Sequence, residues 1–285
     1  MSDIAIIFDF DDTIVPDSTT QLLQSKGIDV DEFWGVKHKA LLERGYDAPH
    51  GYLKLLLDMT EAGQPFHGLK NADLRAFGST LNPYPGVVTL FNDLKNIAQE
   101  LDERTNVHFY VISGGLLEVV KGCTKISKHL SGIWGCRLAS DTNTGPVKYI
   151  QNVITFTEKT RYLFEINKGL SPADTEANPY LVNRDIPEGS RPIPFKNMIY
   201  IGDGLTDIPC FSLIKKNRGY CYGIMHRDRD GNPKRKVIKE LIHSQRIMSL
   251  HSPNYGKKQD LGGMLRGTVA HIAANIKLEQ EQALI

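Results

Sequence analysis

The sequence has little cysteine and no marked excess of charge. Only four of its 285 residues are cysteine, and Cys123, Cys136, Cys210 and Cys221 are widely spaced without a C-x-x-C pair. Disulfide frameworks and zinc sites need clustered cysteines, so this spacing argues against both and indicates a reduced, cytoplasmic setting. The formal net charge of +1 gives no electrostatic reason to expect a nucleic-acid or membrane partner.

Long hydrophobic runs are also missing. No apolar segment approaches the roughly 20 residues that a membrane-spanning helix needs. The first residues, MSDIAIIFDFDD, lack the basic and apolar regions of a signal peptide. A basic run at 227–239 contains acidic residues and a Gly-Asn-Pro turn but no aromatic residues, which favours a solvated loop over a nucleic-acid patch. We therefore expect neither a membrane nor a nucleic acid as partner.

Short apolar runs, in contrast, recur along the chain. A hydrophobic content of 41% with 24% charged residues is typical of a globular protein with a buried core. Four runs rich in β-branched and aromatic residues predict strands that are buried on both faces, as in a parallel sheet. Helical patterns alternate with them, which predicts a doubly wound, Rossmann-like α/β domain. The predicted strands are 4–10, 107–113, 198–203 and 220–225, and the predicted helices are 87–101, 116–129 and 160–168.

Two long connections interrupt this alternation. Residues 17–82 contain helical stretches but no convincing strand, and the following Pro-Tyr-Pro-Gly cannot continue a helix. We predict a small helical cap domain at 17–82, inserted into a core domain of 1–16 and 83–285. The proline-rich stretch 170–196 predicts an ordered surface loop or a partly disordered insertion. Segments 136–139 and 147–155 flank a polar turn and predict a β-hairpin with a longer loop.

Polar residues stand where three of the predicted strands end. These are Asp9 and Asp11, then Ser113, then Asp203. The carboxyl ends of strands line the ligand crevice of an open α/β sheet, so we expect these side chains to converge. Carboxylates that meet there repel one another unless a cation neutralises them, and an all-oxygen ligand set favours Mg²⁺. Because Mg²⁺ typically lies between carboxylates and a phosphate, the pattern predicts phosphoryl chemistry.

The residues around these strand ends sharpen the expectation. Side chains two apart point the same way in an extended segment, which favours Asp11 over Asp12 as the partner of Asp9. We expect Gly114 and Gly115 to open a helix whose free amides would bind an anion.

Three motifs resemble those of the haloacid dehalogenase superfamily. DFDDT at 9–13 resembles its D-x-D-x-T signature, and ISGG at 112–115 resembles its second motif, a hydrophobic strand ending in Ser or Thr. GDGLTD at 202–207 resembles its fourth motif, an acidic loop. The third motif is one lysine at the start of a helix, for which Lys159 is the best match and Lys148 the reserve. The order of the motifs and the insertion after the first agree over nearly the whole chain.

The resemblance implies a phosphatase or phosphotransferase, because dehalogenases of the superfamily usually lack the second acid, Asp11. A helical cap after the first motif is similar to the phosphoserine-phosphatase-like group. That group often carries a Glu nine residues after the nucleophile, contacting the amino group of the substrate. This chain has Ser18 at that position and Asp17 beside it, so both are candidates for substrate contact.

The mechanism implied by the resemblance uses two carboxyl groups. Asp9 attacks phosphorus and forms an aspartyl-phosphate. Asp11 gives a proton to the leaving oxygen and then takes one from water. The resemblance assigns Mg²⁺ to the Asp9 and Asp203 carboxylates and the Asp11 backbone carbonyl, with Asp207 orienting metal-bound water or the lysine. It assigns the phosphoryl oxygens to Ser113, the Gly114 amide and Lys159.

Ordinary structural roles stay open for the same residues. Aspartate is common in turns, Ser113 could cap a helix, and Lys159 could be a solvated lysine of a first helical turn. The aromatic residues of the cap are candidates by position, although helix packing is the more frequent role. A metal role for His50 or His67 is not expected. The aromatic candidates are Phe33, Trp34, Tyr46 and Tyr52.

The predicted function is therefore a Mg²⁺-dependent phosphomonoester hydrolase acting on a small phosphorylated metabolite. Two alternatives remain. A phosphotransferase or mutase would pass the phosphoryl group to another acceptor, and a non-catalytic phosphate-binding protein would share the fold without turnover. The acid at Asp11 argues against the binding protein, which does not need it. The sequence predicts neither the physiological substrate nor the oligomeric state.

Overall fold

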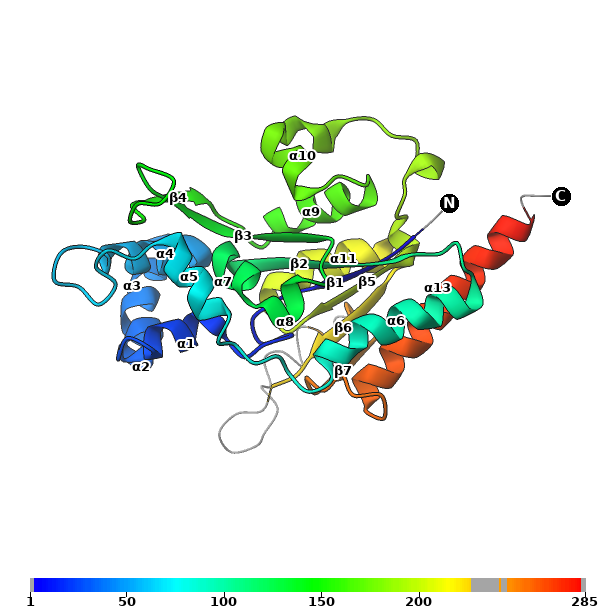
Figure 1. Cartoon of the computed structure of the whole chain (residues 1–285), viewed down its shortest axis with the longest axis horizontal. Coiled ribbons are helices and arrows are strands. Elements are labelled where there is room, and N and C mark those ends of the chain that lie inside the picture. The colour runs from blue at the N-terminus through cyan, green and yellow to red at the C-terminus, as the bar shows by residue number, and fades with distance from the viewer. Residues whose placement is uncertain (1–2, 227–240, 242–244, 283–285) are drawn as a thin grey trace.

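The computed structural model describes residues 3–226, 241 and 245–282, and seven strands of this part form one sheet (Figure 1). The strand order is β4-β3-β2-β1-β5-β6-β7, and neighbours are parallel except for the antiparallel pair β3–β4. The α/β fold class is thereby confirmed. The strands are β1 (Ile4–Phe8), β2 (Val107–Leu116), β3 (Gly132–Ala139), β4 (Tyr149–Asn152), β5 (Met198–Gly202), β6 (Tyr220–Ile224) and β7 (Ser249–His251).

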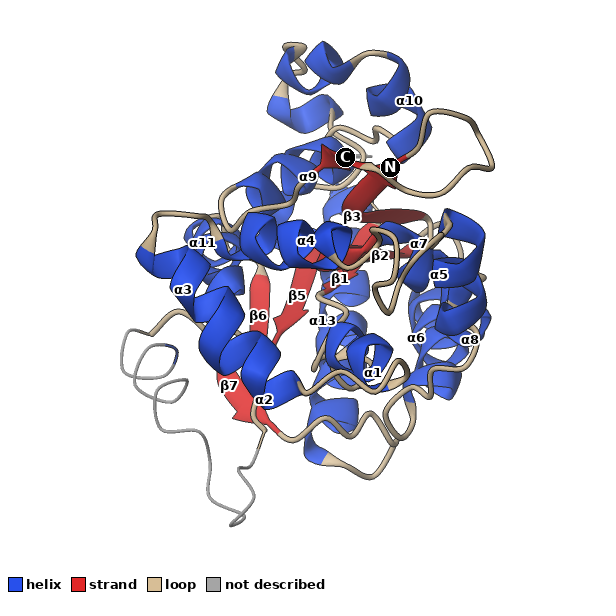
Figure 2. Ribbon diagram, turned by 90° about the vertical axis from the view of Figure 1, so that its left-hand side faces the viewer, coloured by secondary structure: helices blue, strands red, loops and turns tan. Residues whose placement is uncertain are grey.

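Helices cover both faces of the sheet, which is why β1 consists of five apolar residues without solvent exposure. Ile6 of β1 lies between Phe109 of β2 and Ile199 of β5 in the ladder. Figure 2 shows helices on both faces of the sheet. One face carries α6 (Val87–Leu101) and α13 (Asp260–Gln282), and the other carries α9 (Glu158–Asn167) and α11 (Ile208–Lys216).

The predicted element boundaries need correction around β2. The predicted single helix at 116–129 is wrong, because the chain forms α7 (Leu117–Gly122) and α8 (Thr124–Ser127) with a break at Cys123. The ψ of 73° at Cys123 is outside the helical range and separates the two turns. The hairpin is confirmed as β3–β4, but β3 also pairs in parallel with β2 and so extends the main sheet.

Residues 17–82, called the helical segment below, lie beyond the carboxyl ends of β1 and β2, at the left of Figure 1. Its last helix packs on α7 so closely that a Cβ at Gly78 would lie 2.1 Å from the backbone oxygen of Val119. This contact ties the helical segment to the helices of the sheet. Its division from the core at 17 and 82 stays a prediction. It contains α1 (Ser18–Gln24), α2 (Val30–Glu32), a π-helix (Phe33–His38), α3 (Lys39–Glu43), α4 (Ala48–Asp58) and α5 (Asn71–Gly78).

The proline-rich stretch 170–196 is ordered on the outside of α9. It includes the helix α10 (Pro172–Ala177), which the sequence analysis did not predict, and three short 3₁₀ turns. Asn167 of α9 donates a hydrogen bond of 2.8 Å to the carbonyl of Ile193, which fixes the return of the stretch. The basic run at 227–239 lies outside the described residues. Among the described helices, none is both long and apolar enough to span a bilayer.

Candidate active site

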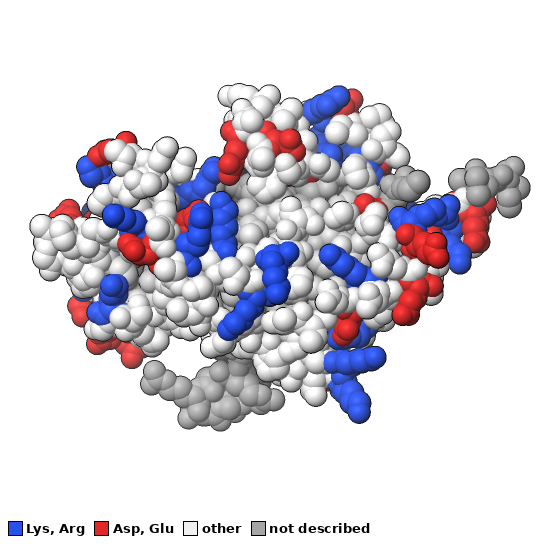
Figure 3. All heavy atoms as spheres, viewed as in Figure 1, with Lys and Arg blue, Asp and Glu red and all other residues white. Residues whose placement is uncertain are grey.

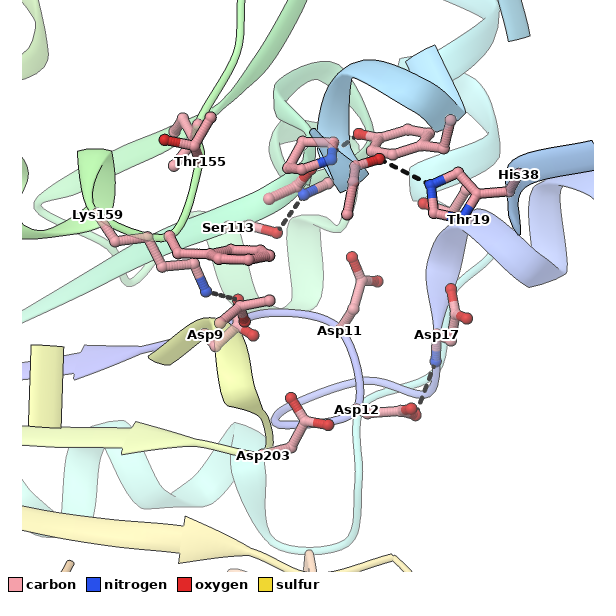
Figure 4. Close-up of a pocket in the computed structure, with 18 of the residues that line it drawn as sticks. Asp9, Asp11, Asp12, Asp17, Thr19, His38, Ser113, Thr155, Lys159 and Asp203 are labelled. Atoms are coloured by element: carbon pink, nitrogen blue, oxygen red, sulfur yellow. Dashed lines mark hydrogen bonds and ion pairs between the residues drawn. The ribbon is translucent and has the colours of Figure 1, made fainter. Parts of the chain in front are cut away.

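The carboxyl ends of β1, β2 and β5 meet at one pocket with a volume of about 250 Å³. Asp9 directly follows β1, Ser113 lies near the carboxyl end of β2, and Asp203 directly follows β5. All three residues line the pocket. The predicted convergence of these strand ends is therefore what the structure shows (Figure 4). The predicted residues Asp11, Asp17, Gly114 and Lys159 also line the pocket.

Lys159 reaches this pocket from the first turn of α9 and is only 2% exposed. Its Nζ lies 3.0 Å from Oδ1 of Asp9 and 2.7 Å from Oδ1 of Asp207. Burial alone would lower the pKa of this amine, but the charges of Asp207 and Asp9 raise it above the ordinary value. The amine therefore stays protonated beside Asp9. The reserve candidate Lys148 is not there: it is exposed and pairs with Asp141.

Asp207 is fully buried, and both of its carboxylate oxygens have partners. Oδ1 accepts a hydrogen bond from the hydroxyl of Tyr200 at 2.7 Å in addition to the Lys159 contact. Oδ2 accepts one from the amide of Gly204 at 3.2 Å. The resemblance implied that Asp207 orients either metal-bound water or the lysine. These contacts match the second role, the orientation of Lys159.

The carboxylates of Asp9 and Asp203 lie close together on the floor of the pocket. Burial raises the pKa of Asp9 to about 7, and the Lys159 charge holds it lower than burial alone would. Burial also raises the pKa of Asp203 well above its usual range, and the neighbouring charges of Asp9, Asp207 and Asp12 raise it further. Each carboxylate thus opposes the ionisation of the other. A bound cation would relieve that repulsion.

Two groups of side chains in the described part of the chain could hold a metal ion. The carboxylates of Asp9, Asp203 and Asp207 offer oxygens within 4.8 Å of one another, and Asp12, Asp203 and His226 form a second such group. The sequence analysis missed Asp12 and His226. The strand-end argument, applied to the fourth strand, would have found His226, which is the second residue after β6. The Asp11 carboxylate belongs to neither group. The contact between the metal and the Asp11 backbone carbonyl, which the resemblance implied, stays a prediction.

Asp11 faces the middle of the pocket rather than its floor (Figure 4). Its Oδ1 accepts a hydrogen bond of 2.7 Å from the amide of Ser18, and Oδ2 lies so close to β2 that a Cβ at Gly115 would be 2.5 Å away. Burial, and then the negative charge of Asp17, raise the pKa of Asp11 to about 7. A carboxyl group with this pKa can both give and take a proton near neutral pH.

The prediction that a helix opens at Gly114 and Gly115 is wrong. Strand β2 continues to Leu116, and α7 begins at Leu117, so Ser113 does not cap a helix. Instead, Ser113 Oγ accepts a hydrogen bond of 2.9 Å from the Gly115 amide, and the strand shifts register against β3 between Ile112 and Leu116. This bulge directs Ser113 and Gly114 into the pocket without a helix N-terminus.

The helical segment forms the opposite end of the pocket. Trp34 and Tyr52 line it, as does Asp17, which caps α1 by accepting a hydrogen bond of 2.9 Å from the Thr20 amide. Ser18 does not line the pocket; its amide holds Asp11. Other aromatic candidates lie elsewhere: Phe33 is buried in the core and Tyr46 is exposed. The lining residues that the sequence analysis missed include Thr19, His38, Pro49, Ile154 and Phe156.

Comparison with known proteins supports the fold assignment. No protein-family model matches the chain. A curated protein of Borreliella burgdorferi (strain B31), described as uncharacterized, is 29% identical over 276 residues, which cover 89% of this chain and 92% of that protein.

Solved structures extend this comparison. A phospho-aspartyl intermediate analogue of phosphoserine phosphatase is similar with a TM-score of 0.55 and 16% identity, covering 94% of this chain and 99% of that one. A HAD family hydrolase of Salmonella enterica serovar Typhi has a TM-score of 0.57 at 15% identity, over 92% of this chain and 69% of that chain. A cytosolic 5'-nucleotidase IIIB bound to cytidine has a TM-score of 0.50 at 13% identity, over 96% and 87%. The chain has the fold of haloacid dehalogenase superfamily hydrolases.

Proposed function

We propose that this chain is a Mg²⁺-dependent phosphomonoester hydrolase that forms an aspartyl-phosphate on Asp9. The observation that carries the proposal is the arrangement of groups from distant segments around one pocket. Asp9 lies 3.0 Å from the buried amine of Lys159, and Asp11, Ser113 and Asp203 line the same pocket. The groups that we propose as nucleophile, proton donor and phosphoryl-binding site therefore line the same pocket.

The residues on the pocket floor fit a hard divalent cation. Asp9 and Asp203 offer carboxylate oxygens within 4.8 Å of each other, and their mutual repulsion favours an ion between them. We assign the ion to these two carboxylates and to the Asp11 backbone carbonyl, and leave Asp207 to orient Lys159. A bound Mg²⁺ would supply positive charge that neutralises the acids and the phosphoryl oxygens.

The proposed reaction has two steps. In the first, an Asp9 oxygen attacks phosphorus in line, the bond to the alcohol oxygen breaks, and the proton of Asp11 passes to that oxygen. In the second, water attacks phosphorus, Asp11 takes its proton, and the bond to Asp9 breaks to release inorganic phosphate. Lys159, Ser113 and the Gly114 amide hold the phosphoryl oxygens in both steps.

The helical segment would act as a cap domain that contacts the alcohol part of a small phosphorylated substrate. A phosphotransferase would use the same groups with an alcohol in place of water. Product analysis in the presence of glycerol separates the two: a hydrolase releases one phosphate per alcohol, whereas a transferase forms glycerol phosphate.

The metal assignment is tested by phosphate release from a panel of alkyl and aryl phosphates, with Mg²⁺ and after chelation. We expect chelation to abolish turnover and Mg²⁺ to restore it. Asp203→Asn should raise the Mg²⁺ concentration for half-maximal rate at least about tenfold. The matched control is Asp141→Asn, an exposed acid outside the pocket. Turnover that survives chelation, or an equal Mg²⁺ requirement in both variants, would contradict the assignment.

A further inference from the structure

The end of the pocket away from Lys159 combines aromatic rings with one carboxylate. These rings are those of Trp34, His38 and Tyr52, which all come from the helical segment. Figure 4 shows Asp17 on this side, beyond Asp11 as seen from Lys159. The alcohol part of a substrate whose phosphoryl group lies at Asp9 would extend toward these residues.

The carboxylate and the indole ring are held in place by one shared threonine. Trp34 Nε1 donates a hydrogen bond of 2.8 Å to Thr20 Oγ1, which in turn donates one of 2.6 Å to Asp17 Oδ2. The Trp34 ring also meets the His38 ring edge to face, with centroids 5.1 Å apart. Acid and aromatic face are therefore preorganised relative to each other before a substrate binds.

Among the described residues, no lysine or arginine that lines this end balances the charge of Asp17. Among the described residues that line the pocket, Lys159 is the sole lysine or arginine, and its amine is held between Asp9 and Asp207. Five aspartates line the same pocket: Asp9, Asp11, Asp12, Asp17 and Asp203. A substrate carboxylate here would meet like charge and no described partner, which disfavours phosphorylated amino acids and hydroxy acids.

On the basis of the proposed hydrolase function, we propose that the substrate is a phosphorylated amino alcohol, whose leaving group carries a cationic nitrogen and no carboxylate. Asp17 attracts the nitrogen by charge, and the faces of Trp34 and Tyr52 attract it through cation–π interaction. A neutral aromatic leaving group would gain from the rings but nothing from Asp17. A cationic leaving group gains from both.

Matched substrate pairs test this directly. Choline phosphate and 3,3-dimethylbutyl phosphate have the same shape, but the second has carbon in place of the charged nitrogen. We expect kcat/KM to be at least about tenfold higher for choline phosphate. Ethanolamine phosphate should likewise exceed serine phosphate, which adds a carboxylate, by at least about tenfold. Equal or higher kcat/KM for the neutral isostere or for serine phosphate would overturn the inference.

This design separates the inference from the function on which it rests. Equal hydrolysis of both members of a pair, with normal hydrolysis of an aryl phosphate, overturns the amino-alcohol inference and leaves the hydrolase standing. No hydrolysis of any phosphomonoester in the presence of Mg²⁺ overturns both.

Asp17→Asn tests the residue itself. Asparagine still caps α1, so the fold should persist, and thermal unfolding checks this. We expect the preference for choline phosphate over its isostere to fall to less than about twofold. The Asp17 charge also raises the pKa of Asp11, so the substitution can change the rates for choline phosphate and for its isostere by the same factor. The ratio of the two kcat/KM values cancels this common factor and reports only the contact with the leaving group. The matched control, Asp29→Asn, alters the cap of α2 outside the pocket and should keep the wild-type ratio. An unchanged ratio in Asp17→Asn, or an equal loss in the control, would overturn the assignment of Asp17.

Discussion

The two ends of the pocket are built in different ways. The phosphoryl end, defined here by Asp9, Ser113, Lys159 and Asp203, comes from strand ends and α9, and its lysine is buried between carboxylates. The leaving-group end, defined by Asp17, Trp34 and Tyr52, comes from the helical segment. In the proposed mechanism, groups at the ends of the strands would carry out the reaction, and the helical segment would select which phosphate ester reacts. Substitutions at the two ends should therefore have different kinetic signatures.

The largest effect is expected at the nucleophile. Asp9→Asn should lower kcat for every substrate by at least about 10³-fold, because the asparagine amide cannot accept the phosphoryl group. Phosphate release measured for an alkyl ester and for an activated aryl ester should fall together. Retention of either activity would mean that another group attacks phosphorus.

The next effect concerns proton transfer by Asp11. Asp11→Asn should slow hydrolysis of alkyl phosphates about 10²–10⁴-fold, because the poor leaving group needs its proton. With 2,4-dinitrophenyl phosphate, whose leaving group needs none, the variant should show one rapid burst of dinitrophenol and then stall at the aspartyl-phosphate. Stopped-flow absorbance measures both phases. Equal loss for the two kinds of ester would contradict the acid role.

The same group sets a pH dependence in the wild-type protein. The pKa of Asp11 is raised from 3.8 to about 7, so the donor form persists to near-neutral pH and is lost above it. Burst-phase rates for alkyl phosphates should therefore decline above about pH 7, while those for the dinitrophenyl ester should not. A parallel decline for both esters would place the titration elsewhere.

Lys159 provides a matched comparison with the reserve candidate Lys148. Lys159→Met keeps much of the side-chain length but removes the charge between Asp9 and Asp207, and should lower kcat by about 10²–10³-fold. Lys148→Met, in an exposed pair with Asp141, should change kcat by less than about twofold. Thermal unfolding of both variants shows whether the fold persists. Equal kinetics in the two variants would contradict the role of Lys159.

The convergence of three strand ends could be predicted from the sequence because its signal is local. An acid or hydroxyl at the end of an apolar run identifies Asp9, Ser113 and Asp203, and the strand topology then brings them together. Lys159 needed the family resemblance, because a lysine in a first helical turn has no local sign of burial. The predicted helix start at Gly114 failed because a bulge in β2, closed by Ser113 Oγ and the Gly115 amide, carries the strand past the motif.

The leaving-group end was harder to predict because packing of the helical segment determines it. His38 and Phe156 carry no local pattern that would mark them as pocket residues. His38 ends the π-helix at 33–38 and Phe156 lies in the loop after β4, and only the folded chain brings both to one pocket. Among the aromatic candidates, periodicity could not separate Trp34 and Tyr52, which line the pocket, from Phe33, which is core. The left-handed backbone of Asp12, with a φ of 55°, also has no local sign in the sequence, because it is a feature of the folded turn.

The smallest effect is expected at the contact between the two ends. The Tyr52 hydroxyl donates a hydrogen bond of 2.8 Å to the carbonyl of Gly114 and so links α4 to the phosphoryl end. Tyr52→Phe should lower the free energy of unfolding by about 1 kcal/mol and change kcat/KM by less than about fivefold. Denaturant unfolding and steady-state kinetics measure the two quantities. A loss of kcat as large as that of Lys159→Met would show that the hydroxyl takes part in the reaction.

The most direct measurement is to trap the phosphorylated protein. Rapid acid quench during turnover of 2,4-dinitrophenyl phosphate with Mg²⁺, followed by peptide mass spectrometry, should find one phosphoryl group on Asp9, at a higher level in Asp11→Asn than in the wild type. The same quench of Asp9→Asn should find none. A phosphoryl group on another residue, or hydrolysis that proceeds without any phosphorylated protein, would contradict covalent catalysis by Asp9.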